Sequence, residues 1–192
     1  MKKIRTGIIG TGFIGPAHIE AVRRLGYVDV IALAEDGMAL AETKSTALSI
    51  PKAYGNWREL LADNEIDVVH ICTPNTLHYP IAKEAIAAGK HVVCEKPLAI
   101  NIKQAEETVE ACDRNNVLLA VNYLHRLHPH VIKAKELIKN QTIGKLVSVN
   151  VSFNLDFPPG DNFRFNKELS GGGALRDLGT HMIDLLRFFG GE

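Results

Sequence analysis

The sequence predicts an α/β fold: a doubly wound parallel sheet, followed by the beginning of a second domain of the α+β class. Short apolar runs alternate with helical patterns over residues 4–122, which is typical of a chain of strand–helix–strand units. The apolar runs are rich in β-branched residues and lack polar alternation, as expected of strands covered on both faces. Beyond residue 123 this rhythm stops, and one segment alternates apolar and polar residues instead.

The elements follow from these patterns in chain order. We expect strands over residues 4–10, 28–34, 67–73, 91–94 and 117–122. We expect helices over residues 14–25, 38–48, 78–88 and 102–115, with a short helical turn over 57–61. The boundary falls near residues 121–126, which gives a first domain of residues 1–122 and a second of residues 123–192. In the second domain we expect a helix over 129–140, a turn over 141–144, an antiparallel type of strand over 145–155 and a loop over 156–166.

Composition excludes several classes of protein. Hydrophobic residues make up 46% of the 192, so a packed core is expected and disorder is not. Lys and Arg number 22, as do Asp and Glu, and this balance argues against a nucleic-acid partner. No apolar run approaches the roughly 18 residues that span a bilayer, and the amino-terminal stretch is too short and Gly-broken for a secretory signal. Three cysteines without a CxxC pair suit a reducing compartment, so we expect a cytoplasmic protein.

A glycine loop follows the first expected strand. The stretch 10-GTGFIG-15 places glycines at 10, 12 and 15, between a strand and a helix. In this context Gly10 allows a tight turn, Gly12 allows a pyrophosphate to approach the backbone, and Gly15 allows the helix to pack close to the strand. The alternative is a Gly-rich turn without a ligand.

An acidic pair follows the second expected strand. Glu35 lies 20 residues after Gly15, where a carboxylate can accept hydrogen bonds from the adenosine ribose and repel a 2′-phosphate. This spacing favours NAD over NADP, although NADP remains possible. The alternative is that Glu35 or Asp36 only caps the next helix.

Two further loops are expected at the same edge of the sheet, where ligands of open α/β sheets bind. They are 73-TPNTLH-78 and 94-CEKPLA-99, each stiffened by a proline. This position directs Lys96 toward the cofactor cleft. The alternative is a solvated lysine at the end of a strand.

The last segment, 171-GGGALRDLGTHMIDLLRFFGG-191, has a helical pattern with two sides. Asp177, His181 and Asp184 share one side, opposite an apolar stripe. Asp177 and His181 are one turn apart, close enough for a carboxylate to orient an imidazole. The alternative is a surface Asp–His pair without a function.

Together these residues resemble the glucose–fructose oxidoreductase / inositol dehydrogenase / MocA (Gfo/Idh/MocA) family, in its amino-terminal part. The EKP turn combined with D-x-G-x-H is more specific than the glycine loop. The matching pieces span nearly the whole chain in the family's order: 8-IIGTGFIG-15, 72-CTPNTLHYPIAKEAIAAGKHVVCEKPLA-99, 143-IGKL-146 and 171-GGGALRDLGTHMIDLLRFFGG-191.

The resemblance implies a Rossmann dinucleotide-binding domain and an NAD(P)-dependent dehydrogenase or reductase acting on a hydroxyl carbon of a sugar, inositol or similar polyol. It implies that Lys96, Asp177 and His181 are catalytic and also contact the substrate, together with Tyr123 and Arg126. The implied cofactor-binding residues are Gly10, Gly12, Phe13, Ile14, Gly15, Glu35, Thr73, Pro74, Asn75, His78, Glu95, Lys96 and Asn122. The family chemistry needs no metal, and although histidines crowd the stretch 125-HRLHPH-130, we expect no metal site there.

The chain is shorter than the family pattern. The resemblance implies that the second domain is incomplete here, and that the full-length parent forms a homo-oligomer through that domain. A dinucleotide-binding regulatory module without catalysis is therefore a second interpretation.

Overall fold

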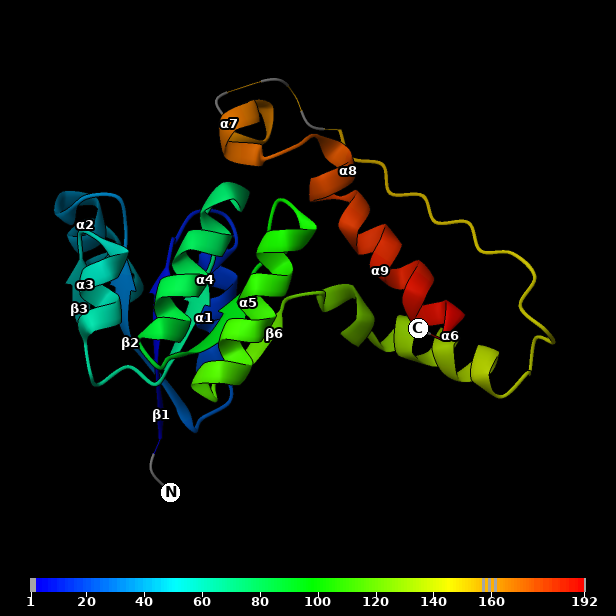
Figure 1. Cartoon of the computed structure of the whole chain (residues 1–192), viewed down its shortest axis with the longest axis horizontal. Coiled ribbons are helices and arrows are strands. Elements are labelled where there is room, and N and C mark those ends of the chain that lie inside the picture. The colour runs from blue at the N-terminus through cyan, green and yellow to red at the C-terminus, as the bar shows by residue number, and fades with distance from the viewer. Residues whose placement is uncertain (1–2, 157, 159, 161, 192) are drawn as a thin grey trace. The chain divides into compact units, whose positions relative to one another are not determined.

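The computed structural model describes residues 3–156, 158, 160 and 162–191 of the chain (Figure 1). The chain divides into two compact units, Met1–Val121 and Asn122–Glu192.

The first unit contains a parallel sheet. In the described part of the chain its six strands run in the order β3-β2-β1-β4-β5-β6. Chain order therefore proceeds from β1 to one side and then resumes with β4 on the other side of β1, which makes the β1/β4 junction a topological switch point. The strands are β1 (Ile4–Ile9), β2 (Val28–Ala34), β3 (Lys52–Tyr54), β4 (Val68–Ile71), β5 (His91–Cys94) and β6 (Leu119–Val121).

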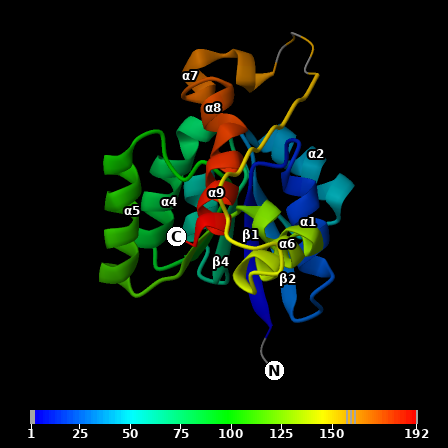
Figure 2. The same cartoon turned by 90° about the vertical axis from the view of Figure 1, so that its right-hand side faces the viewer.

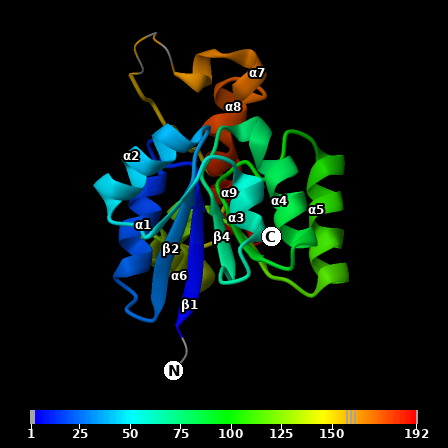
Figure 3. The same ribbon diagram turned by 90° about the vertical axis from the view of Figure 1, so that its left-hand side faces the viewer.

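Helices cover both faces of this sheet (Figure 3). Helices α1 (Gly15–Arg23) and α2 (Met38–Leu48) pack on one face, around a core that includes Ile8 and Leu33. Helices α3 (Trp57–Ala62), α4 (His78–Ala87) and α5 (Ile102–Asn115) pack on the other face, around a core that includes Ile9 and Ile71. Because successive side chains of a strand point to opposite faces, Ile8 and Ile9 enter different cores.

The second unit is helical where it is described. Its helices are α6 (Pro129–Lys139), α7 (Lys167–Ser170), α8 (Ala174–Asp177) and α9 (Gly179–Gly190), and α9 lies against α6 (Figure 2). Short 3₁₀ turns are η1 (Asn75–Leu77) in the first unit, and η2 (Leu124–Leu127) and η3 (Phe163–Phe165) in the second. Among the residues described, no helix combines the length and the apolar character needed to cross a membrane.

The structure confirms the doubly wound α/β class and differs from the predicted elements at several places. The edge strand β3 was not predicted, because three residues are too few to show a periodicity. The predicted helix over the last segment is two helices, since α8 ends at Asp177 and α9 begins at Gly179.

The predicted strand over residues 145–155 is wrong. That segment is extended but forms no strand in the structure, and all the strands of the described chain lie in the first unit (yellow in Figure 1). An alternating sequence becomes a strand only when a neighbouring strand accepts and donates its backbone hydrogen bonds. The described residues of the second unit offer no such neighbour.

Candidate functional site

The carboxyl edge of the parallel sheet carries the three loops singled out by the sequence. The glycine loop follows β1, residues 73–78 follow β4, and residues 95–97 follow β5. Since β1, β4 and β5 are neighbours in the sheet, these loops lie next to one another at the switch point, where open α/β sheets bind their ligands.

Two of the three loop glycines are required by the fold. Gly10 has φ +87°, a conformation that favours glycine, and a Cβ there would lie 3.0 Å from the carbonyl oxygen of Cys72. A Cβ on Gly15 would lie 2.4 Å from the carbonyl oxygen of Gly10, a contact between two backbones that no rotamer change can relieve. The close packing predicted for Gly15 is therefore present.

Gly12 differs from its neighbours because the protein does not need it to be glycine. A Cβ added there would meet no described atom within 4 Å. The missing side chain leaves room above an exposed stretch of backbone, next to the start of helix α1. Nearby, the buried hydroxyl of Thr73 finds no hydrogen-bond partner among the described residues, and its methyl group lies close to Gly10. An open backbone cradle, a helix N-terminus and an unsatisfied hydroxyl fit a dinucleotide.

Glu35 binds the glycine loop itself. Its Oε1 accepts the backbone N–H of Thr11 at 2.5 Å and also the Thr11 hydroxyl. Helix α2 begins after Gly37, and no described side chain caps it. The alternative in which Glu35 or Asp36 caps that helix is therefore wrong.

His78 joins the two other loops. Its Nδ1 lies 2.6 Å from the carbonyl oxygen of Pro97, and its Nε2 lies 2.9 Å from that of Thr73. Burial lowers the pKa of His78 although two carbonyl oxygens lie beside it, so the ring is neutral at pH 7. Its single N–H then donates to one of these two carbonyl oxygens. His78 is buried, as is Asn75 of the same loop, whereas Pro74 is half-buried.

The turn after β5 places a carboxylate beside the candidate lysine. Lys96 is half-buried, its peptide bond to Pro97 is cis, and its N–H donates to Glu95 Oε2 at 3.2 Å. The other oxygen, Oε1, lies 2.9 Å from Nε2 of His18 on α1. His18 Nδ1 in turn lies 2.9 Å from Nδ1 of His70 on β4.

His70 makes the first unit sensitive to acid. Burial, and then the neighbouring His18, lowers the pKa of His70 from 6.5 to about 4. The unfolded chain therefore binds a proton at His70 between pH 6.5 and 4 that the folded chain excludes. The stability due to this group is complete above pH 6.5 and is lost as the pH falls toward 4, by up to about 3 kcal/mol. We expect urea unfolding at about pH 7.5 and about pH 4.5 to show this loss of stability, and His70→Val to reduce the loss.

The control for this measurement is His91→Gln, a change at a half-buried histidine on the neighbouring strand β5. The control should keep the wild-type pH dependence. An equal pH dependence in wild type and His70→Val would contradict the assignment to His70.

In the second unit, the predicted polar side of the last segment is buried. The exposed fractions are 5% for Asp177, 6% for His181 and 7% for Asp184, whereas Leu175 on the predicted apolar stripe is 73% exposed. The alternative of a surface Asp–His pair is therefore wrong. Buried charged groups need partners, and the structure supplies them.

Each of the two carboxylates is held by an arginine. Asp177 Oδ2 accepts from Arg164 Nε at 2.6 Å. Asp184 pairs with Arg126 through both oxygens, and this hydrogen bonding raises the pKa of Arg126. Arg126 thus anchors η2 to α9, in addition to the substrate contact predicted for it.

His181 lies against two rings from the segment that begins the second unit. The His125 ring centroid is 4.4 Å away at 90°, and that of Tyr123 is 6.2 Å away at 85°. Burial, and then Asp184, raises the pKa of Tyr123. Asn122, also predicted to be functional, is the first residue of this unit and is half-buried.

The structure adds residues that the sequence did not single out: His18, His70 and Arg164. No local motif marks them, since His18 and His70 lie within a helix and a strand, and Arg164 lies in the short 3₁₀ turn η3. Among the described residues, no three His, Cys, Asp or Glu side chains gather as metal ligands would.

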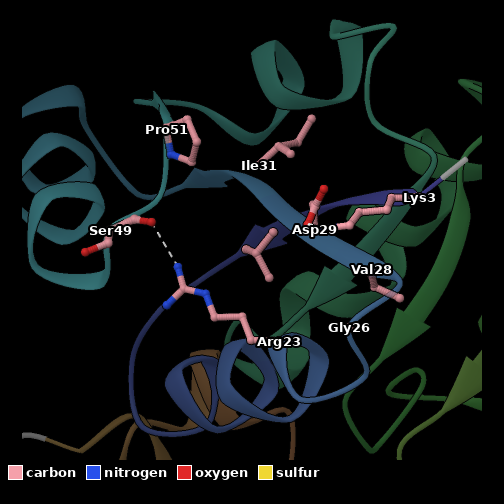
Figure 4. Close-up of a pocket in the computed structure, with 9 residues that line it drawn as sticks. Lys3, Arg23, Gly26, Val28, Asp29, Ile31, Ser49 and Pro51 are labelled. Atoms are coloured by element: carbon pink, nitrogen blue, oxygen red, sulfur yellow. Dashed lines mark hydrogen bonds and ion pairs between the residues drawn. The ribbon is translucent and has the colours of Figure 1, made fainter.

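A hollow of about 400 Å³ lies elsewhere, near the beginning of β2 (Figure 4). Its cations already have partners: Lys3 pairs with Asp29 at 2.8 Å, and the Arg23 guanidinium donates to the carbonyl oxygens of Leu48 and Ser49. It is remote from the carboxyl edge of the sheet and contains none of the predicted site residues.

Known proteins are similar to this chain in sequence and in fold. A family model described as "Oxidoreductase family, NAD-binding Rossmann fold" (GFO_IDH_MocA) matches residues 4–123, and a model of the "GFO/IDH/MocA C-terminal domain" matches residues 131–192. Levoglucosan dehydrogenase of Pseudarthrobacter phenanthrenivorans is 34% identical over 100% of this chain and 52% of its own length. D-xylose 1-dehydrogenase (NADP(+)) 2 of Haloferax volcanii is 33% identical over 95% of this chain and 56% of its own length.

Among solved structures, levoglucosan dehydrogenase in complex with NADH and levoglucosan superposes with a TM-score of 0.87 at 32% identity, over 97% of this chain and 54% of that one. The chain thus spans about half the length of the curated relatives it matches.

Proposed function

Because the chain belongs to the Gfo/Idh/MocA oxidoreductase family, we propose that its protein is an NAD-dependent oxidoreductase that transfers a hydride between a nicotinamide cofactor and a hydroxyl carbon of a sugar, inositol or similar polyol. The observation that carries this proposal is the position of Lys96. It lies on a proline-containing turn at the same edge of the sheet as a glycine loop whose middle glycine serves no packing purpose of its own.

The cofactor would be held by the first unit. The loop from Gly10 through Phe13 and Ile14 to Gly15 would bind the pyrophosphate with its backbone N–H groups and the start of α1. The second oxygen of Glu35 would accept from the ribose, while its first oxygen keeps Thr11 in place. The loops after β4 and β5, with Thr73 and Glu95, would border the nicotinamide end. When bound, the nicotinamide supplies the hydride acceptor.

The catalytic work falls to three side chains. As a secondary alcohol is oxidised, negative charge develops on its oxygen, and the Lys96 ammonium would stabilise that charge more than it stabilises the neutral alcohol. His181 would take the departing proton, a contribution of roughly 10²–10⁴ in rate. Asp177, fixed by Arg164, would orient His181 or bind a neighbouring hydroxyl, with Tyr123 and Arg126 bordering the substrate.

The proposal is tested with the full-length protein. NAD⁺ is mixed with a panel of aldoses, anhydrosugars and inositols, and NADH formation is followed by its absorbance. Turnover of at least one polyol with NAD⁺ is the expected result. Tight NADH binding without turnover of any panel member would favour the regulatory interpretation instead.

Glu35 should decide between NAD and NADP. We expect Glu35→Gln to tighten NADPH binding by about tenfold relative to NADH, because removing about 1.4 kcal/mol of charge repulsion corresponds to that ratio. Fluorescence titration with both reduced cofactors measures it. Asp36→Asn, at the exposed neighbouring acid, is the matched control and should leave the ratio near that of the wild type. A wild-type protein that prefers NADPH would contradict this role of Glu35.

Other properties of the full-length protein follow from the same premise. We expect a homo-oligomer assembled through the second domain, to be checked by light scattering. The charge balance supports a protein without a nucleic-acid partner. The cysteines Cys72, Cys94 and Cys112 are free and buried, and free thiols suit a reducing compartment, so we expect a cytoplasmic location.

A further inference from the structure

Three titratable side chains form a buried chain beneath the carboxyl edge of the sheet. His18 comes from α1, His70 from β4 and Glu95 from the turn after β5, and their exposed fractions are 9%, 8% and 7%. Two contacts of 2.9 Å join them: Glu95 Oε1 to His18 Nε2, and His18 Nδ1 to His70 Nδ1. The two imidazole rings are perpendicular, at 87°. Such a chain is costly to bury unless every polar atom in it is satisfied.

The chemistry of these groups assigns the protons. An ionised carboxylate only accepts, so His18 Nε2 carries a proton and donates it to Glu95. The contact between the two Nδ1 atoms holds one proton, because a hydrogen bond needs one donor and one acceptor. Either ring can supply that proton while His70, whose pKa is lowered, stays uncharged at pH 7, and in both cases Nε2 of His18 donates to the carboxylate. His18 therefore presents a fixed donor to the carboxylate.

The position of His18 gives this chain its significance. His18 lies one helical turn after Gly15, on the helix whose N-terminus faces the cradle at Gly12. Through Glu95 it reaches the turn that carries Lys96, since the second Glu95 oxygen accepts the Lys96 N–H. One helix thus supports both the pyrophosphate end and the nicotinamide end of the proposed dinucleotide site.

We propose that His18, backed by His70, is a positioning residue for the nicotinamide end of the cofactor site and acts by fixing the carboxylate of Glu95. The inference rests on the proposed function, because it takes that site to bind a nicotinamide dinucleotide. His18 itself touches neither the substrate nor the cofactor in this role. Its loss should weaken ligands that extend to the turn at Glu95 and spare ligands that end at the pyrophosphate.

The test compares NADH with ADP in the full-length protein. ADP occupies only the adenosine and pyrophosphate end, so it reports the glycine loop and Glu35 but not the turn at Glu95. We expect His18→Leu to weaken NADH by about tenfold or more, the scale of one lost hydrogen bond to a charged group, and to change the Kd of ADP by less than about twofold. His18→Gln, which keeps an N–H near the position of Nε2, should restore most of the NADH affinity.

A double-mutant cycle tests whether His18 acts through the carboxylate of Glu95. If His18 acts through the carboxylate, His18→Leu should cost no further NADH affinity once Glu95→Gln is present. Additive losses, or equal losses of NADH and ADP, would overturn the proposal, the latter by showing that His18 only supports the loop. If His18→Leu fails to fold, the Kd values of NADH and ADP are measured for His18→Gln, His70→Val and wild type instead. His70→Val should then also weaken NADH and spare ADP.

Imidazole ¹⁵N spectra give a readout without cofactor. The proposal requires a protonated Nε2 at His18 near neutral pH, and an unprotonated Nε2 would overturn it. A wild-type protein that binds neither NADH nor ADP would overturn the proposed function and this inference together. A wild type that binds both, with His18→Leu unaffected toward NADH, would overturn this inference alone.

Discussion

Replacing Lys96 with methionine is expected to lower kcat/KM for the polyol by about 10²–10³, the usual loss when one charge-stabilising donor is removed from a transition state. Methionine preserves most of the length and apolar stem of the side chain and removes only the ammonium. Because the charge on the substrate oxygen develops during the reaction, the loss should fall on kcat more than on KM.

Steady-state kinetics of the full-length protein measure this loss, and a titration with NADH checks that the cofactor still binds. Lys103→Met is the matched control, since Lys103 is an exposed lysine on α5. Full activity of the Lys96→Met protein would remove the central residue of the proposed mechanism.

The second large effect is expected at Gly15, where alanine should destabilise the first unit by roughly 3 kcal/mol. The added Cβ would lie 2.4 Å from the carbonyl oxygen of Gly10, so the start of α1 and the turn after β1 must separate. Urea unfolding of wild type and variant gives the difference in the free energy of unfolding.

Gly12→Ala is the matched partner of that experiment. Open space surrounds Gly12, so its stability should stay within about 0.5 kcal/mol of wild type. NADH affinity should nevertheless fall by about tenfold or more, because the methyl group would occupy the place of the pyrophosphate. A stable Gly12→Ala protein that binds NADH normally would show that this cradle is not the cofactor site.

Much of the fold could be predicted because it depends on local patterns. Runs rich in β-branched residues and without polar alternation indicate strands of a parallel sheet covered on both faces. Strand β2 and helix α2 begin and end at the predicted residues. The segment over residues 145–155 could not be judged in this way. Its alternation is a local property, whereas becoming a strand depends on a partner elsewhere.

The candidate site likewise contains residues that local motifs predict and residues that only the packing of distant segments brings together. Lys96 and the glycine loop belong to short motifs whose chemistry can be read from neighbouring residues. Arg164 and Asp177 pair across 13 positions, and His18 reaches Glu95 across 77. Contacts of this kind are set by the packing of whole elements, and no spacing rule in the sequence encodes them.

The three buried thiols can be used to measure how often parts of the first unit open to solvent. Alkylation requires that the reagent reach the thiolate. An alkylating dye can therefore react with Cys72 or Cys94 only when the surrounding strands separate and expose the thiol. Cys112 lies on the outer helix α5 and would react whenever that helix alone detaches. The labelling rate of Cys112 divided by that of Cys94 would distinguish local detachment of α5 from unfolding of the sheet.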